Sequence, residues 1–183
     1  LLPAQITLLS GPGCPVCVPP AGAMDAVFAL AKDPHILLAS YGDLLRIPGT
    51  QRKTSLLSQK AKGARVESVY SPMDALRLAK AHPELEVVFL GVGFETTAPG
   101  TAACILQAAS EKLSNFSVLC LLKRTEPALR SLIEAKDFGV SGFLCPGHVA
   151  AVTGSDAFSF LPKDYGLPAV VAGFDAADLP YSV

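Results

Sequence analysis

Hydrophobic residues in this chain gather in short runs, separated by longer segments in which apolar residues recur with helical spacing. The short runs are rich in β-branched residues and predict strands, while the longer segments predict helices. We expect strands at residues 5–9, 36–40, 65–70, 86–90, 116–121, 142–144 and 169–172. We expect helices at residues 21–32, 54–62, 72–81, 97–113, 126–136 and 157–165. One helix start is marked clearly, because Ser71 precedes a proline and Asp74 lies in the first turn.

The alternation of strands and helices predicts an α/β fold. Each pair of parallel strands needs a crossover connection, and strands buried on both faces explain why the apolar runs are continuous. We expect two small Rossmann-like subdomains with parallel sheets and a cleft between them. The first would cover residues 1–97 and the second residues 98–183, although no linker rich in Gly and Ser marks the boundary.

The composition narrows the classes of function. Of the 183 residues, 50% are hydrophobic and 17% are charged, which excludes intrinsic disorder of the whole chain. The net charge of -1 and the lack of a basic block argue against binding nucleic acid. The longest apolar runs, residues 87–92 and 118–122, are too short to cross a membrane. The first residues resemble neither a signal peptide nor a natural start, so we expect a piece of a longer chain. An odd number of cysteines, five, favours reduced thiols in a cytoplasmic protein.

A rigid loop with two cysteines follows the first predicted strand. The segment Gly11-Pro12-Gly13 precedes Cys14, and Cys17 follows at C-x-x-C spacing just before the first predicted helix. Two thiols at this spacing can chelate one soft metal ion or close a small disulfide, and a helix N-terminus beyond them favours the thiolate form. A buried structural pair of cysteines is the simpler alternative. A zinc site is another, although structural zinc normally has four ligands and no second ligand pair follows.

A second candidate site lies between the fourth predicted strand and the helix after it. Glu95, Thr96 and Thr97 follow Gly91-Val92-Gly93 at the carboxyl end of a buried strand, where α/β proteins place their sites. A carboxylate and two hydroxyls there could orient a ligand or relay protons. The glycines match a dinucleotide-binding motif only loosely, because Thr96 occupies the third glycine position. The structural alternative is helix capping by one of the two threonines.

A third candidate is His148, which follows Cys145-Pro146-Gly147 after another predicted strand. A histidine there serves either acid–base chemistry or structure, and Cys145 beside it could be reactive or a core residue. Asp43 and Arg46 lie three residues apart and more simply predict a local ion pair or a helix cap. Two further cysteines are expected to fill the hydrophobic core: Cys104 and Cys120.

Four motifs occur in a specific order and spacing. They are Gly11–Cys17 (GPGCPVC), Tyr41–Gly49 (YGDLLRIPG), Gly93–Pro99 (GFETTAP) and Pro146–Val149 (PGHV), followed by the strand at residues 170–174 (VVAGF). As a set they resemble the HypD family, whose members help to assemble the iron centre of [NiFe] hydrogenases. The resemblance extends over essentially the whole chain.

The resemblance implies a cytosolic scaffold for an iron that bears cyanide and carbon monoxide, the Fe(CN)2CO group. A small HypC-type chaperone would share this iron, HypE and HypF would deliver cyanide, and the finished group would pass to the hydrogenase large subunit. Cys14 and Cys17 correspond to the family's thiols for redox chemistry and for holding iron. The family's cleft-lining motifs correspond to Glu95, Thr96, Thr97 and His148.

The family pattern also has parts that these residues lack. An upstream motif carries a further cysteine and histidines, and a C-terminal domain holds a [4Fe-4S] cluster. Leu122-Lys123-Arg124 stands where a His-Lys pair is expected, and Gly173–Ala176 stands where a Glu-Pro is usual. From the residues alone, a thioredoxin-like dithiol oxidoreductase is the competing hypothesis, because its C-x-x-C motif also lies at a helix start.

Overall fold

The computed structural model describes residues 3–11, 13–14, 19–51 and 53–173. The chain forms two compact units. The large unit comprises Cys14–Lys123, and the split unit comprises Leu1–Gly13 together with Arg124–Val183. Each unit contains its own parallel sheet, and we describe the two separately.

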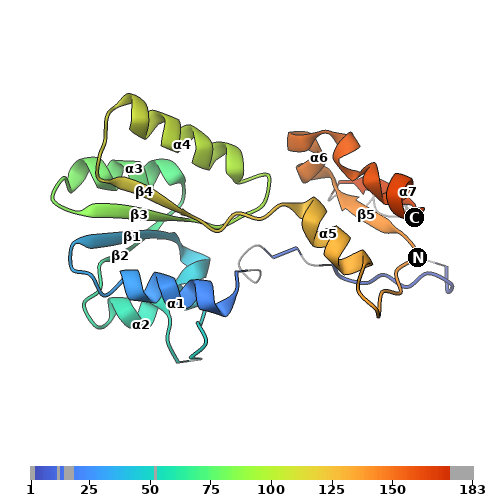
Figure 1. Ribbon diagram of the computed structural model, residues 1–183, viewed down its shortest axis with the longest axis horizontal. Helices are drawn as coiled ribbons and strands as arrows, with labels where there is room; N and C mark the ends of the chain where they lie inside the picture. The colour runs from blue at the N-terminus through green and yellow to red at the C-terminus, as the bar shows by residue number, and fades with distance from the viewer. Residues whose placement is uncertain (1–2, 12, 15–18, 52, 174–183) are drawn as a thin grey trace. The chain divides into compact units, whose positions relative to one another are not determined.

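The large unit is a doubly wound α/β structure. Its four strands are β1 (Ile36–Tyr41), β2 (Val66–Val69), β3 (Glu86–Gly91) and β4 (Phe116–Cys120), all parallel in the order β2-β1-β3-β4. Its helices are α1 (Ala21–Leu30), the 3-10 helix η1 (Gly42–Arg46), α2 (Leu56–Lys60), α3 (Pro72–Ala81) and α4 (Ala98–Ser110). Helices α1 and α2 cover one face of this sheet, and α3 and α4 cover the other (Figure 1). The carboxyl ends of the four strands therefore share one edge of a sheet that is covered on both faces.

The two faces of this sheet follow the two-residue period of a strand. In β1, Leu38 packs with residues of α1, including Val27, whereas its neighbour Ala39 packs with residues of α3, including Ala75. These four side chains are fully buried, as is Phe89 of β3. Burial of each large apolar side chain contributes about 1.5–3 kcal/mol, so the two layers fix the sheet between the helices.

The predicted start of α3 is confirmed in detail. The Ser71 hydroxyl accepts a hydrogen bond from the Asp74 amide at 3.3 Å, and the Asp74 carboxylate accepts one from the Ser71 amide at 3.0 Å. This reciprocal pair is a capping box, with Pro72 at the first helical position. The Ser71 hydroxyl also donates to the Asp74 carboxylate at 3.0 Å, and this hydrogen bond is the main cause of the lowered pKa of Asp74.

The split unit has a smaller sheet. Strands β5 (Phe143–Pro146) and β6 (Ala169–Ala172) are parallel, and the helices are α5 (Thr125–Ile133), α6 (Gly147–Thr153), η2 (Ser155–Phe158) and α7 (Phe160–Tyr165). Arg130 joins two of these helices, because its guanidinium contacts Glu126 of α5 at 3.1 Å and Asp164 of α7 at 2.8 Å. The same guanidinium lies 4.5 Å from the centre of the Phe160 ring, within the range of a cation–π interaction.

The predicted α/β fold with parallel sheets is confirmed, and three details differ. Residues 5–9 are predicted as a strand but form none, because no strand among the described residues pairs with them. Helix α6 begins at Gly147 and includes the last three residues of the PGHV motif, where the sequence predicts no helix. The large unit also continues past the predicted boundary at residue 97, because β4 pairs with β3 in continuous register.

Candidate functional site

The carboxyl edge of the large sheet brings the segment after β3 beside the segment after β4. Pairing between the two continues beyond the strands, since the amide of Leu121 donates to the Gly91 carbonyl at 2.8 Å and the amide of Lys123 donates to the Gly93 carbonyl at 2.9 Å. These two backbone hydrogen bonds therefore hold one side of the segment that leads into the turn with Glu95. This is the edge at which doubly wound sheets bind ligands.

Gly93 lies in very close contact with Thr97 across this turn. A Cβ atom on Gly93 would lie 2.4 Å from both Cβ and Oγ1 of Thr97, a distance that atoms in contact do not tolerate. The amide of Thr97 donates to the Phe94 carbonyl at 3.0 Å and closes the turn. A glycine is thus required for the chain to fold back tightly before α4.

The predicted capping role is only partly met. Thr97 occupies the N-cap position of α4, but its hydroxyl makes no capping hydrogen bond. Its backbone carbonyl instead accepts a hydrogen bond from the Thr101 hydroxyl at 3.3 Å. Thr96 is exposed and Glu95 is half-buried, so both reach solvent at the start of α4. A carboxylate and a hydroxyl in this position can bind a polar ligand or exchange protons with it.

The two predicted thiol ligands differ in what the structure describes. Cys14 is exposed at the beginning of the large unit. Cys17 lies outside the described residues. The exposure of Cys14 rules out the simple alternative of a fully buried pair, and an exposed thiol is accessible to a soft metal ion or to a disulfide partner.

His148 lies in the split unit, whereas Glu95, Thr96 and Thr97 lie in the large unit. It is exposed in the first turn of α6, directly after β5. Its neighbour Cys145 is 3% exposed, and burial raises the pKa of this thiol to about 11. Cys145 is therefore a protonated core residue at neutral pH, which settles the choice left open by the sequence.

Two further sequence predictions need correction. Cys104 is fully buried as expected, but Cys120 is exposed, because β4 is an edge strand of the sheet. Asp43 and Arg46 are both exposed on η1, and neither forms an ion pair or a capping hydrogen bond with a described residue. The expected local pair between them is thus not formed.

The described part of the chain lacks two features that are typical of metal-binding and membrane-spanning proteins. Within residues 3–11, 13–14, 19–51 and 53–173, no three His, Cys, Asp or Glu side chains are grouped so as to hold a metal ion. No helix among these residues is both long and apolar enough to cross a bilayer.

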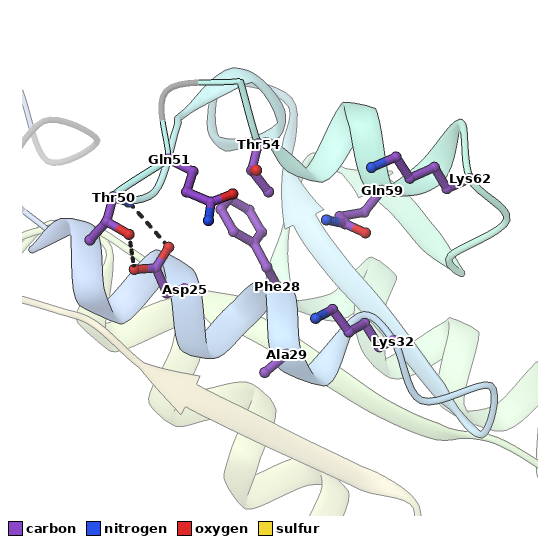
Figure 2. Close-up of a pocket in the computed structure, with 9 residues that line it drawn as sticks. All are labelled: Asp25, Phe28, Ala29, Lys32, Thr50, Gln51, Thr54, Gln59 and Lys62. Atoms are coloured by element: carbon purple, nitrogen blue, oxygen red, sulfur yellow. Dashed lines mark hydrogen bonds between the residues drawn. The ribbon is translucent and has the colours of Figure 1, made fainter.

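A polar hollow lies elsewhere on the large unit, beside α1 and α2. It has a volume of about 520 Å³, and Figure 2 shows its lining: Asp25, Phe28, Ala29, Lys32, Thr50, Gln51, Thr54, Gln59 and Lys62. The Asp25 carboxylate accepts hydrogen bonds from the Thr50 amide at 3.1 Å and from the Thr50 hydroxyl at 2.7 Å. A Cβ atom on Gly49 would lie 2.1 Å from an Asp25 oxygen, so this glycine lets the loop press against α1.

This hollow contains none of the side chains that the sequence singled out. Its two lysines, Lys32 and Lys62, follow the C-terminal ends of α1 and α2, where a positive charge offsets the negative end of a helix. This interaction with the helix ends accounts for both lysines, so their presence does not indicate a bound ligand. The one sequence signal for this hollow is Gly49, which ends the YGDLLRIPG motif. Its close packing against α1 could not be predicted without knowing where α1 lies.

Comparison with known proteins gives a consistent result. The family model HypD, described as "Hydrogenase formation hypA family", matches residues 1–183. The "Hydrogenase maturation factor HypD" of Escherichia coli (strain K12) is 48% identical over 179 residues, covering 98% of this chain and 48% of that protein. The proteins of the same name from Azotobacter vinelandii and Cupriavidus necator are 46% and 41% identical, covering 98% and 100% of this chain and 48% and 50% of theirs.

The chain thus spans about half the length of the curated relatives it matches. All three of these relatives are named as hydrogenase maturation factors, and the thioredoxin-like alternative is not favoured.

Proposed function

The chain belongs to the HypD family, and on that premise we propose that it is the central part of a [NiFe]-hydrogenase maturation scaffold. We call the full-length protein that contains these residues the parent protein. In this proposal the parent protein holds an iron with cyanide and carbon monoxide ligands, the Fe(CN)2CO group, as cargo. The observation that carries the proposal is the 48% identity over 98% of the chain to a hydrogenase maturation factor.

The thiols of Cys14 and Cys17 are the proposed contacts to the cargo. Thiolate sulfur is a soft donor that suits an iron whose other positions are taken by strong-field ligands. The exposure of Cys14 supports this role, because a cargo that arrives and leaves needs an accessible ligand. The same two thiols can also alternate between the dithiol and disulfide states.

The remaining candidate residues have a supporting role in this proposal. Glu95, Thr96 and Thr97 lie at the carboxyl edge of the large sheet, and His148 lies directly after β5 in the split unit. A carboxylate, two hydroxyls and an imidazole can orient polar ligands and move protons as ligands are added. A HypC-type chaperone would share the iron, HypE with HypF would supply cyanide, and the hydrogenase large subunit would receive the group.

The proposed [4Fe-4S] cluster belongs to a part of the parent protein outside these residues. Such a cluster normally takes four cysteine thiolates. Of the cysteines in the described residues, Cys104 and Cys145 are buried in hydrophobic clusters, which leaves too few accessible thiols. The proposal therefore assigns no cluster to the units described above.

The first experiment tests the thiols directly. The parent protein is co-expressed without oxygen with its HypC-type partner, and the purified complex is examined by infrared spectroscopy and iron analysis. We expect bands of metal-bound cyanide in the wild type and their loss in Cys17→Ala. Cys120→Ala is the matched control, because it removes another exposed thiol of the large unit and should leave the bands unchanged.

Three results would contradict the proposal or a part of it. A correctly assembled wild-type complex without cyanide bands would remove the scaffold function. Bands that persist in Cys17→Ala would leave the scaffold intact but remove this thiol from the iron. Rapid turnover of a generic disulfide by the parent protein would instead support a dithiol oxidoreductase, since an iron scaffold should be a poor general reductant.

A further inference from the structure

The two-stranded sheet of the split unit leaves apolar side chains exposed on one of its faces. Leu144 of β5 and Val170 of β6 are register partners on one face, yet they are 38% and 43% exposed. On the opposite face Cys145 is 3% exposed, in a cluster to which α5, α6 and α7 all contribute. Parallel sheets are normally covered on both faces, and a sheet of two strands is seldom stable alone. One face of this sheet therefore lacks its cover.

The large unit shows what a complete arrangement looks like in the same chain. Its sheet has four strands in the order β2-β1-β3-β4, and helices cover both faces (Figure 1). The two helices that precede β3 and β4, namely α3 and α4, share one face and pack against each other. Likewise α5 precedes β5, α7 precedes β6, and the two are joined through Arg130. Strands β5 and β6 therefore correspond to the second half of a doubly wound sheet.

A segment with strand character in the split unit is left without a partner. Residues 5–9 read Gln-Ile-Thr-Leu-Leu, a strongly β-forming run, but they form no strand. Leu8 and Leu9 are 54% and 70% exposed. In the order seen in the large unit, this segment would correspond to the outer strand β2. The position that corresponds to β1, between this segment and β5, is then the one not filled by the described residues.

The burial of β5 and β6 also indicates at which edge of the small sheet a further strand would pair. Cys145 and Val171 are register partners on the face that carries the helices, but Val171 is 40% exposed whereas Cys145 is 3% exposed. The helical layer thus extends over β5 and not over the outer side of β6. A strand added at the free edge of β5 would lie beside the covered strand.

We infer that a segment preceding residue 1 in the parent protein completes this sheet. It supplies a parallel strand between residues 5–9 and β5, and a helix that covers Leu144 and Val170. The relatives are about twice as long as this chain, so the parent protein has enough residues for both elements. Two partly exposed side chains, Leu144 and Val170, cannot by themselves supply the buried area of about 800 Å² per partner that a stable interface between separate molecules has. A segment of the same chain needs less area, because tethering raises its effective concentration.

Hydrogen exchange at one amide tests the inference. The Phe143 amide donates to the Pro168 carbonyl toward β6, so the alternation of a strand directs the Leu144 amide to the free edge of β5. Pro146 has no amide hydrogen, which leaves Leu144 as the donor along that edge of β5. In the parent protein we expect this amide to exchange at least about 100-fold more slowly than in an unstructured peptide, because exchange would require local unfolding.

The other edge of the same sheet provides a matched control. By the same alternation the Val171 amide points to the free edge of β6. The inference places no strand there, so this amide should exchange faster than that of Leu144. Fast exchange at Leu144 in the folded parent protein would overturn the inference. So would protection at Leu144 that disappears on dilution, because that result would assign the edge to a second copy of the chain.

A pair of substitutions tests the cover over the bare face. In the parent protein, Leu144→Glu should lower the melting temperature by several degrees, because the carboxylate would be buried beneath the covering helix. Leu57→Glu is the control, since Leu57 is 49% exposed on α2 of a complete unit and should tolerate the charge. Equal, small effects of the two substitutions would contradict the proposed cover. If Leu144→Glu does not fold at all while Leu57→Glu does, the contrast supports it.

Discussion

The thiols of this chain are distinguished by their surroundings more than by their positions in motifs. Cys104 and Cys145 lie in hydrophobic clusters, and burial raises the pKa of each. The Cys104 thiol also lies 3.2 Å from the Pro72 carbonyl, to which it donates a weak hydrogen bond. Cys14 and Cys120 are exposed. Metal binding and disulfide exchange both need the thiolate form of cysteine, which burial disfavours. The exposed thiols are therefore the ones that can serve the chemistry proposed for this family.

The burial of Cys145 and its raised pKa predict slow alkylation of this thiol and a stability that depends on pH. At pH 8 an alkylating reagent should modify Cys120 much faster than Cys145 in the folded parent protein, as read by peptide mass spectrometry. The Cys145 thiol ionises near pH 11 in the native state and near its ordinary pKa of 9.0 when unfolded. Between these values the unfolded state has lost the proton that the native state keeps. The free energy of unfolding should therefore fall as the pH rises from 9 to 11.

Cys145→Ala isolates this contribution from other groups that titrate in the same range. The decline in the free energy of unfolding between pH 9 and 11 should be shallower in the variant than in the wild type. Identical slopes, or equal labelling of Cys120 and Cys145, would show that the Cys145 thiol is accessible to water.

At the scale of elements, the turn between β3 and α4 predicts a sharp difference between two glycines. Gly93→Ala should destabilise the parent protein by about 1–3 kcal/mol, because the new methyl group would overlap Thr97. Gly100→Ala should be neutral or stabilising by up to about 1 kcal/mol, because nothing lies within 4 Å of its Cβ position in α4. Denaturant unfolding measures both variants. A Gly93→Ala variant as stable as Gly100→Ala would mean that the turn can open without cost.

Most elements could be predicted from the sequence because their signals are local. The helix at 72–81 and the strand at 169–172 have the predicted bounds, since a proline, a capping serine and a run of β-branched residues mark them. Pairing is not local, and this explains the failures. Residues 5–9 have strand character but no neighbour, and Cys120 has core character but lies on an edge strand.

The candidate site was predictable as a set of motifs and not as a geometry. The sequence located Glu95, Thr96 and Thr97 after a buried strand, and the structure places them at the carboxyl edge of a complete sheet. It could not foresee that Thr97 packs against Gly93 instead of capping α4, because that contact depends on how tightly the turn closes. Nor could it separate Cys145 from His148, which are three residues apart but buried and exposed, respectively.

At the scale of the whole molecule, the large unit is continuous in sequence whereas the split unit is assembled from two segments. A continuous unit with a sheet covered on both faces has everything it needs to fold alone. We therefore expect residues 14–123, expressed as a fragment, to unfold in one cooperative thermal transition followed by circular dichroism. A fragment of residues 14–97, which ends at the boundary expected from the sequence, should show no such transition.

The reason for this contrast is the packing that α4 and β4 provide. Without them β3 loses its ladder with β4, and Leu76 of α3 loses the contacts it makes with Cys104 and Ala108. Phe89 of β3 would also lose the partly buried residues of β4 that pack against its cluster. Exposing several large apolar side chains costs about 1.5–3 kcal/mol each, comparable in sum to the stability of a small domain. A cooperative transition in residues 14–97 would contradict this prediction, because it would show that the first three strands suffice without α4 and β4.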